Sequence, residues 1–466
     1  MNELIISLSD KEGKHLYEQI YSHIKKEIVE GRMNTKEKLP STRALSLYLQ
    51  VSRSTVSLAY EQLLAEGYIE AVKGSGYYVS RLDNLYQNTE KVSPTVSGQV
   101  KQKEENRIVF SPVGVDLSQF PYSVWRKITR EVLAAEEELF VGGDAQGELA
   151  LRTSIRQYIH AARGVNCSEE QIIVGAGNEY LLMLLQKLIG TDTIVAFEDP
   201  TYMKAYKSFA DAGFPVRLVS MDQSGMDVSQ LEETNADIAY VMPSHQYPTG
   251  IVMPIGRRLE LLRWAAKSPN RYVIEDDYDS EFRYKGKPIP SLQSTDRGDN
   301  VIYIGTFSKA VAPAIRVSYM VLPRTLLQRY QEQGTYLSAT VSRMDQRILN
   351  EFMKKGYFER YLNRMRKVYR DKHDKLLALL VPFEKKFKIA GEWSGLHLLL
   401  TAKENVTEQV LIQQAAEAGV TVFGMTDNLV EDKEQYTKRA TILLGYAALS
   451  DQDMEKGIEQ LKKAWL

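Results

Sequence analysis

The chain has 466 residues and a formal net charge of −1. That length exceeds one ordinary core and favours two or three domains. The near-zero charge excludes a general attraction to nucleic acid, so any DNA binding must come from a local arrangement of basic groups. The single cysteine, Cys167, leaves neither a disulfide framework nor a thiolate metal site within one chain, and we expect no metal.

The first residues lack the basic and apolar regions of a signal peptide. No later stretch holds the roughly 18 uncharged apolar residues that a membrane span needs. A reducing compartment suits a chain with one cysteine, so we expect a cytoplasmic protein that is neither secreted nor embedded in a membrane.

Three short helices are predicted at the start of the chain. The first is marked by apolar residues at helical spacing, namely Leu16, Ile20, Ile24 and Ile28, and by Gly31 as a stop. The second is predicted over 42–50, after a proline and a serine, and the third begins after Ser52.

A hairpin is predicted directly after these helices. Two β-prone runs, 68–72 and 77–80, are joined by Lys-Gly-Ser-Gly, and the glycines permit a tight turn. Three helices and a hairpin make a winged helix-turn-helix, which we assign to residues 1–80.

Such a domain presents the start of its third helix to the major groove and holds phosphates with basic and hydroxyl side chains. The residues that we predict to bind DNA lie at that start, in the second helix and in the wing: Ser52, Arg53, Ser54, Thr55, Arg43, Lys73, Gly74 and Gly76. Ser52 caps a helix whose amides favour phosphate, and Arg53 adds charge-assisted bonds to phosphate or guanine. The alternative is a solvated face of a protein-interaction module.

The stretch from Leu39 to Val79, "LPSTRALSLYLQVSRSTVSLAYEQLLAEGYIEAVKGSGYYV", resembles the DNA-binding domain of GntR-type bacterial regulators. The resemblance covers nearly all of residues 12–80, including the Ser52-Arg53 pair and the glycine-bearing wing. It implies that a double-stranded DNA operator is a partner of this chain.

A polar stretch at 81–106, poor in apolar periodicity, predicts a linker. After it, apolar β-prone runs alternate with helical stretches, which is typical of a largely parallel sheet covered on both faces. We assign 107–466 to this α/β domain, with a large part at about 107–330 and a smaller α+β part at about 331–466.

Lys309 stands in an unusual place within this second domain. An apolar strand, 301–304, runs into a short polar turn that contains Lys309, and Arg316 follows. A lysine that forms a Schiff base needs a protected pocket that lowers its pKa. A cofactor phosphate would need Arg316, the hydroxyl of Thr306 or Ser308, and the amides of a helix start.

Pyridoxal phosphate also needs an acid for its ring nitrogen and a donor for its phenolic oxygen. The stretch "EDDYDSEF" offers both, and we choose Asp276 for the nitrogen and Tyr278 for the oxygen. The spacing leaves Glu275 and Asp277 open as alternatives to Asp276. Tyr202, after another strand, is predicted to stack on the ring.

Together, a glycine-bearing helix start, Pro-x-Tyr, "SHQYPTG", "EDDY" and "FSK" resemble fold-type I aminotransferases across 107–466. The resemblance implies pyridoxal phosphate, a Schiff base at Lys309 and phosphate contacts from Gly177, Asn178, Thr306 and Arg316. A GntR-like winged helix joined to such a domain resembles the MocR subfamily of regulators, especially its GABA-sensing type.

The chain departs from these patterns at four positions. Leu443 replaces the arginine that holds a substrate carboxylate in working aminotransferases, and Tyr247, which we count among the cofactor-binding residues, replaces an asparagine. The two arginines of the GABA-sensing type are replaced by Lys204 and Asp427, our candidate effector-binding residues. We therefore expect an effector other than GABA, either a ligand with a second amino group or pyridoxal phosphate itself.

The sequence thus predicts a regulator that binds an amine, an amino acid or pyridoxal phosphate through an aldimine at Lys309 and thereby alters operator binding. The resemblance implies a head-to-tail homodimer with exchanged winged helices. One alternative is an active aminotransferase with an appended DNA-binding domain, although Leu443 argues against efficient turnover. Another is a DNA-binding protein whose second domain is a scaffold with an idle cofactor.

Overall fold

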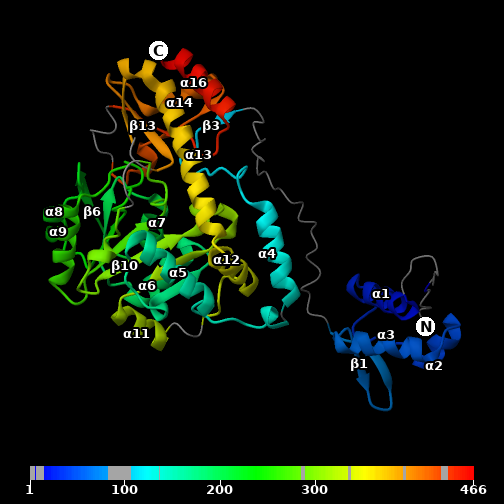
Figure 1. Cartoon of the computed structure of the whole chain (residues 1–466). Coiled ribbons are helices and arrows are strands. Elements are labelled where there is room, and N and C mark those ends of the chain that lie inside the picture. The colour runs from blue at the N-terminus through cyan, green and yellow to red at the C-terminus, as the bar shows by residue number, and fades with distance from the viewer. Residues whose placement is uncertain are drawn as a thin grey trace. The chain divides into compact units, whose positions relative to one another are not determined.

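The computed structural model describes residues 6, 15–81, 107–135, 137–284, 289–333, 337–391, 395–431 and 439–466. The chain divides into two compact units, Met1–Gln102 and Lys103–Leu466 (Figure 1). The predicted linker at 81–106 lies almost wholly outside the described residues. No helix among the described residues is long and apolar enough to cross a membrane.

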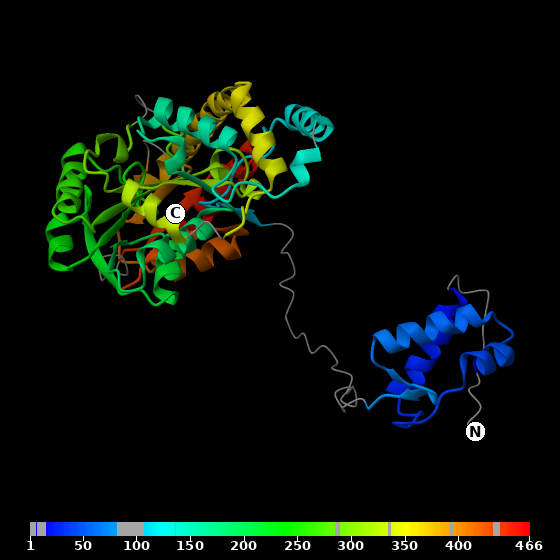
Figure 2. The ribbon, with the colours of Figure 1, turned by 90° about the horizontal axis from the view of Figure 1, so that it is seen from below.

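The first unit is a winged helix. Helices α1 (Leu16–Val29), α2 (Thr42–Leu49) and α3 (Arg53–Ala65) precede an antiparallel hairpin of β1 (Ile69–Val72) and β2 (Gly76–Val79) (Figure 1 and Figure 2). The helical spacing of the apolar residues predicts which side of α1 is buried. In the structure, the three isoleucines on that side pack against the buried face of α3.

Side-chain caps and glycines set the ends of these elements. Ser41 and Ser52 are the N-caps of α2 and α3, and their hydroxyls accept hydrogen bonds from backbone amides of the first turn, both at 3.1 Å. Gly74 and Gly76 have φ of +78° and +116°, so the turn of the wing needs glycine.

The second unit is built on an eight-stranded sheet of order β4-β11-β10-β9-β8-β5-β6-β7. Its strands are β4 (Ile172–Gly175), β5 (Val195–Asp199), β6 (Val216–Asp222), β7 (Gly225–Met226), β8 (Ile238–Val241), β9 (Tyr272–Asp277), β10 (Val301–Thr306) and β11 (Ser318–Val321). The strands from β10 to β6 are parallel to one another, so their carboxyl ends meet at one edge. Strand β11 runs antiparallel to both neighbours.

Helices cover both faces of this sheet. One face packs on α6 (Asn178–Ile189), α7 (Met203–Asp211) and α11 (Arg324–Gln333). The other packs on α5 (Leu149–Arg163), α8 (Val228–Glu233), α9 (Ile255–Ala266) and α12 (Arg343–Lys354). Residues alternate between the two cores along a strand, as Ile302 and Tyr303 do on β10, so the predicted doubly covered sheet is confirmed.

The smaller part holds a four-stranded antiparallel sheet of order β12-β13-β16-β15. Its strands are β12 (Phe387–Ala390), β13 (His397–Ala402), β16 (Thr441–Gly445) and β15 (Phe423–Gly424). Helices α14 (Glu408–Glu417) and α16 (Asp451–Trp465) pack beside it, and the long α13 (Tyr357–Leu380) runs from the larger part to the smaller (Figure 1).

The packing departs from the predicted division of this unit at residue 330. Helix α12 shares its core with α5 and with α4 (Tyr122–Ala135) of the larger part. Conversely, β3 (Ile108–Val109) pairs with β14 (Val420–Thr421), and Phe110 joins the core of the smaller part. Helical periodicity shows which face of a helix is apolar but not which element covers it, so these two packing partners could not be predicted from the sequence.

Candidate functional site

The residues predicted to bind DNA are accessible on the first unit. Arg43, Ser52, Arg53, Ser54, Lys73, Gly74 and Gly76 are exposed, and Thr55 is half-buried. The Ser52 hydroxyl lies 2.7 Å from that of Ser54 and 2.8 Å from that of Thr55, so hydroxyl groups cluster at the start of α3. Arg53 reaches back to the Thr42 hydroxyl at 3.4 Å. A helix start with backbone amides, hydroxyls and a guanidinium is suited to phosphate.

A pocket of about 130 Å³ opens at the carboxyl edge of the large sheet. Eight of the nine predicted cofactor-binding residues line it: Asn178, Tyr202, Tyr247, Asp276, Tyr278, Thr306, Lys309 and Arg316. The others that line it are Pro112, Val113, Glu179, Met242 and Ser308. The topology gathers these residues, because the strand ends and helix starts that carry them meet at the same edge.

Lys309 lies in α10 (Phe307–Ala310), the short helix that follows β10, and Thr306 is the N-cap of that helix. The Lys309 amine donates to the Val113 carbonyl at 2.6 Å. Burial lowers the pKa of Lys309 to about 8, and the positive charge of Lys204 adds to this shift whereas Asp279 opposes it. About one tenth of this amine is therefore neutral at pH 7, against less than about one thousandth for an unperturbed lysine, which favours its role as a nucleophile.

The sequence left open which of Glu275, Asp276 and Asp277 faces the cofactor. All three lie on β9, where successive side chains point to opposite faces of the sheet, so Asp276 faces away from the other two. Asp276 lines the pocket and lies 3.4 Å from the Asn178 amide, and the Tyr240 hydroxyl donates to it. Glu275 instead accepts from the amides of Leu292 and Gln293 at 2.8 and 2.9 Å. Burial raises the pKa of Asp276 to about 6, against the hydrogen bonds from Tyr240 and Asn178.

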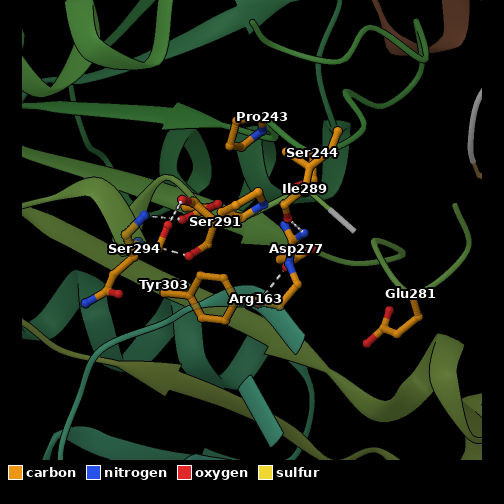
Figure 3. A network of polar contacts seen from close by, with 12 residues as sticks. Arg163, Pro243, Ser244, Asp277, Glu281, Ile289, Ser291, Ser294 and Tyr303 are labelled. Atoms are coloured by element: carbon orange, nitrogen blue, oxygen red, sulfur yellow. Dashed lines mark hydrogen bonds and ion pairs between the residues drawn. The ribbon is translucent and has the colours of Figure 1, made fainter. Parts of the chain in front are cut away.

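Asp277 belongs to a buried network of polar contacts (Figure 3). It follows Asp276 directly on β9, so its side chain points to the opposite face of the sheet. It accepts from the Arg163 guanidinium at 2.8 Å and from the Tyr303 hydroxyl at 2.5 Å. Arg163, only 4% exposed, also bonds Ser244 and the Ile289 carbonyl. This arginine ties α5 to the ends of β8 and β9, and nothing in its sequence surroundings on α5 singles it out.

The start of α6 and Arg316 form one end of the pocket. Gly177 is the N-cap of α6 with φ of +95°, and any side chain there would collide with the Arg316 guanidinium. Arg316 pairs with Glu179 at 2.6 Å, a partner that the sequence did not indicate. Burial acts to raise the pKa of Glu179, but its own backbone amide and Arg316 hold it below the usual range.

Three tyrosines form an aromatic wall. The Tyr202 and Tyr247 rings meet edge to face with centroids 6.1 Å apart, and Tyr247 meets Tyr278 in the same way at 6.1 Å. Tyr247 packs against the apolar cluster of Leu399, Met425 and Leu443. Leu443 is fully buried, and the described residues of this cluster offer no cation at the place where the resemblance predicts the carboxylate-binding arginine of a working aminotransferase.

The two candidate effector-binding residues lie outside the pocket lining. Lys204 is exposed, and its amine is 3.9 Å from Glu179, which does line the pocket. Asp427 is exposed in the turn after β15. Burial, and next the carboxylate of Asp427, raise the pKa of Tyr247 to about 12. Both residues therefore act on groups of the pocket from its surroundings.

Two family models match the chain: "Bacterial regulatory proteins, gntR family" over residues 16–79 and "Aminotransferase class I and II" over residues 115–461. The chain is 38% identical to the uncharacterized HTH-type transcriptional regulator YdeL of Bacillus subtilis, covering 97% of this chain and 96% of that protein. It is 30% identical to the probable rhizopine catabolism regulatory protein MocR of Rhizobium meliloti, covering 97% and 94%. It is 29% identical to the pyridoxine biosynthesis transcriptional regulator PdxR of Corynebacterium glutamicum, covering 91% of each.

Among solved structures, the second unit is similar to a kynurenine aminotransferase of Pyrococcus horikoshii solved with PMP. The TM-score is 0.67 at 23% identity, covering 78% of this chain and 92% of the other, which shows the fold.

Pyridoxal phosphate is the cofactor that this aminotransferase domain implies, and the pocket residues fit it. Two buried polar atoms of the lining, Asn178 Oδ1 and Ser308 Oγ, have no hydrogen-bond partner among the described residues. The absence of a side chain at Gly177 lets the Arg316 guanidinium lie against the start of α6. Lys309 supplies an amine for the aldehyde of the cofactor, and the buried Asp276 supplies an acid for its pyridine nitrogen. The start of α6 together with Arg316 supplies hydrogen-bond donors for its phosphate. The chain belongs to the MocR subfamily of GntR-type regulators, which join a winged helix to an aminotransferase class I and II domain.

Proposed function

We propose that this transcriptional regulator senses an amine, an amino acid or pyridoxal phosphate itself at Lys309 and alters its affinity for a DNA operator in response. The observation that carries the proposal is the lysine with a lowered pKa in a pocket whose lining fits the cofactor, in a chain that also exposes a recognition helix. When bound, pyridoxal phosphate supplies an aldehyde that condenses with a primary amine, either that of Lys309 or that of an effector.

The pocket residues take separate roles in this proposal. The neutral amine of Lys309 is the nucleophile, and Asp276 holds a proton on the ring nitrogen. Arg316, Thr306 and the amides at the start of α6 hold the phosphate. Glu179 already pairs with Arg316, so an incoming phosphate competes with a carboxylate for that guanidinium.

The apolar side chains around Tyr247 favour an effector that does not place a carboxylate next to this tyrosine. Leu443 and its apolar neighbours offer no partner to such a group, and burying an unpaired carboxylate costs several kcal/mol. Asp427 would attract a second amino group. The relative whose name refers to pyridoxine biosynthesis supports pyridoxal phosphate itself as the other candidate.

We further propose that the protein acts in the cytoplasm as a head-to-tail homodimer on two operator half-sites. Apolar side chains on and around η3 (Glu137–Phe140) and α5 support a dimer: Phe140 is 79% exposed, Val141 65% and Leu149 57%. Apolar residues exposed together in this way mark an interaction surface. The pairing also matches the two-fold symmetry that helix-turn-helix dimers share with their operators.

An absorbance spectrum of the purified protein, taken before and after a panel of amines and amino acids, tests the proposal when DNA affinity is measured in parallel. We expect one compound to shift the cofactor band and to change the affinity for DNA together. The variant Lys309→Ala should lose both responses. A band that moves with no change in DNA affinity for any compound, pyridoxal phosphate included, would contradict the proposed function.

An active aminotransferase is the second candidate, because the pocket keeps a lysine, an acid and an arginine in one lining. Turnover with keto acids separates the two functions. A sensor forms the linkage with its effector but releases little product, whereas an enzyme releases product in every cycle. Sustained product release with no effect on DNA binding would favour the enzyme.

A further inference from the structure

A buried histidine lies directly behind the tyrosine of the pocket wall. His245, 2% exposed, has its Nδ1 2.9 Å from the Asp279 carboxylate and 2.9 Å from the Tyr278 hydroxyl. Tyr278 lines the pocket, but His245 does not. Asp279 is equally buried, at 2% exposed. The three side chains therefore form a chain of contacts that runs from the pocket into the protein.

Backbone from two parts of the unit fixes the imidazole ring. A side chain at Gly395 would overlap the ring, and the glycine has φ of +86°. A Cβ at Gly250 would lie 3.5 Å from Nε2. The ring of His397 lies beside it, with centroids 5.5 Å apart. No described residue offers Nε2 a hydrogen-bond partner.

The hydrogen-bond partners determine where the protons are. An ionised carboxylate can only accept, so the contact between Asp279 and Nδ1 requires a hydrogen on Nδ1. The same N–H faces the Tyr278 oxygen, which therefore acts as an acceptor toward His245. The hydroxyl hydrogen of Tyr278 is then not needed for this histidine. It is shared between the Asp279 carboxylate, which also interacts with this hydroxyl, and an acceptor in the pocket.

We propose that His245, held by Asp279, is a positioning residue that makes Tyr278 a hydrogen-bond donor toward the ligand in the pocket. The inference deepens the proposed function and rests on it. It assigns Tyr278 as the donor to the cofactor's phenolic oxygen, and it assigns the orientation of that hydroxyl to His245 and Asp279, which lie outside the pocket lining. A donor at that oxygen stabilises negative charge there. In the protein with bound cofactor, this donor would lower the pH at which the absorption band of the cofactor changes.

Three substitutions of His245 separate positioning from packing. His245→Asn places an amide nitrogen at the position of Nδ1 and keeps the donor. His245→Gln places its amide at the position of Nε2, which has no partner, and His245→Leu has no donor. The measurement is the pH midpoint of the bound cofactor's absorption band, with circular dichroism to verify folding. The other titratable groups that face this cluster are unchanged in all three variants: Lys309, Asp276, His397, Tyr247, Tyr284 and Tyr446.

We expect the midpoint to rise by about one pH unit in His245→Gln and His245→Leu, which corresponds to about 1.4 kcal/mol, and to stay at the wild-type value in His245→Asn. In a double-mutant cycle with Tyr278→Phe, His245→Gln should add no further shift, because both act on one hydrogen bond.

The inference is overturned if the shift of His245→Gln adds in full to that of Tyr278→Phe, or if His245→Asn shifts the midpoint as far as His245→Leu. The second comparison keeps the test decisive should His245→Gln fail to fold. These outcomes are separate from failure of the proposed function, which would appear as DNA affinity that no amine or cofactor changes in the wild-type protein.

Discussion

The two sites of this molecule differ in how they are assembled. Half of the residues predicted to bind DNA come from one short run of sequence at the start of α3, and the basic ones are exposed. The cofactor pocket draws on residues from Pro112 to Arg316 and lies against buried networks. Contacts on a solvated surface contribute separately, whereas groups in a buried pocket depend on one another. Changes in the pocket should therefore have larger effects than changes on the DNA-binding surface.

The largest effect is expected from Asp276→Asn. Removing this buried carboxylate takes away the charge that holds a proton on the cofactor's ring nitrogen, and a broken buried pair costs about 3–5 kcal/mol. Affinity for pyridoxal phosphate, measured by equilibrium dialysis, should fall by more than about a hundredfold. Asp192→Asn, which changes an exposed carboxylate of the same unit, is the control and should bind normally. Near-normal binding by Asp276→Asn would show that the pocket is less interdependent than its burial indicates.

The next effect is a pH dependence of cofactor incorporation. Because the pKa of Lys309 is lowered to about 8, its neutral amine falls from about one half at pH 8 to about one hundredth at pH 6. The rate at which the cofactor-free protein takes up pyridoxal phosphate should therefore fall about fifty-fold between these two pH values. Stopped-flow absorbance measures this rate.

Lys204→Ala sharpens the same experiment. The positive charge of Lys204 contributes to the lowered pKa of Lys309, so its removal should move the whole rate profile to higher pH. A rate profile that is flat between pH 6 and pH 8 would mean that the amine of Lys309 is not perturbed by its surroundings.

A smaller effect is expected at the DNA-binding surface. Arg53→Ala removes one exposed guanidinium, and a single base or phosphate contact is worth about 1–3 kcal/mol. Affinity for an operator fragment should fall about tenfold, whereas the absorption band of the bound cofactor should not change. Lys267→Ala, which removes a positive charge from the second unit, serves as the charge-matched control. A change in the cofactor band of Arg53→Ala would show that the two sites are coupled even without an effector.

The sequence predicted the winged helix almost residue by residue because its signals are local. Ser41 and Ser52 cap the helices that they precede, and the glycines of the wing have the positive φ that the turn requires. For the pocket, the sequence placed Lys309 at the end of a strand, and the fold then brought the other predicted residues to the same edge.

Other features could not be predicted because they depend on distant partners. The choice among Glu275, Asp276 and Asp277 required knowing which face of β9 packs on α5, where Arg163 binds Asp277. Glu179 pairs with Arg316, 137 residues away in sequence. His245 could be placed against Asp279 only once β8 and β9 were known to be adjacent. Local patterns give the elements and their faces, but the partners across the sheet come from the topology.

The smallest effect is expected from Lys73→Ala in the wing, and it tests most directly whether surface contacts are separable. Lys73 is exposed, with no ion pair to a described residue, so it should act on the phosphate backbone as a point charge. DNA affinity should fall only a few-fold, and equally for operator and unrelated sequences. The slope of log affinity against log salt should decrease by about one.

If Arg53→Ala and Lys73→Ala together cost the sum of their separate free energies of binding, the DNA-binding surface is a set of independent contacts. A cost well above that sum would instead mean that the wing and α3 depend on each other as the pocket residues do.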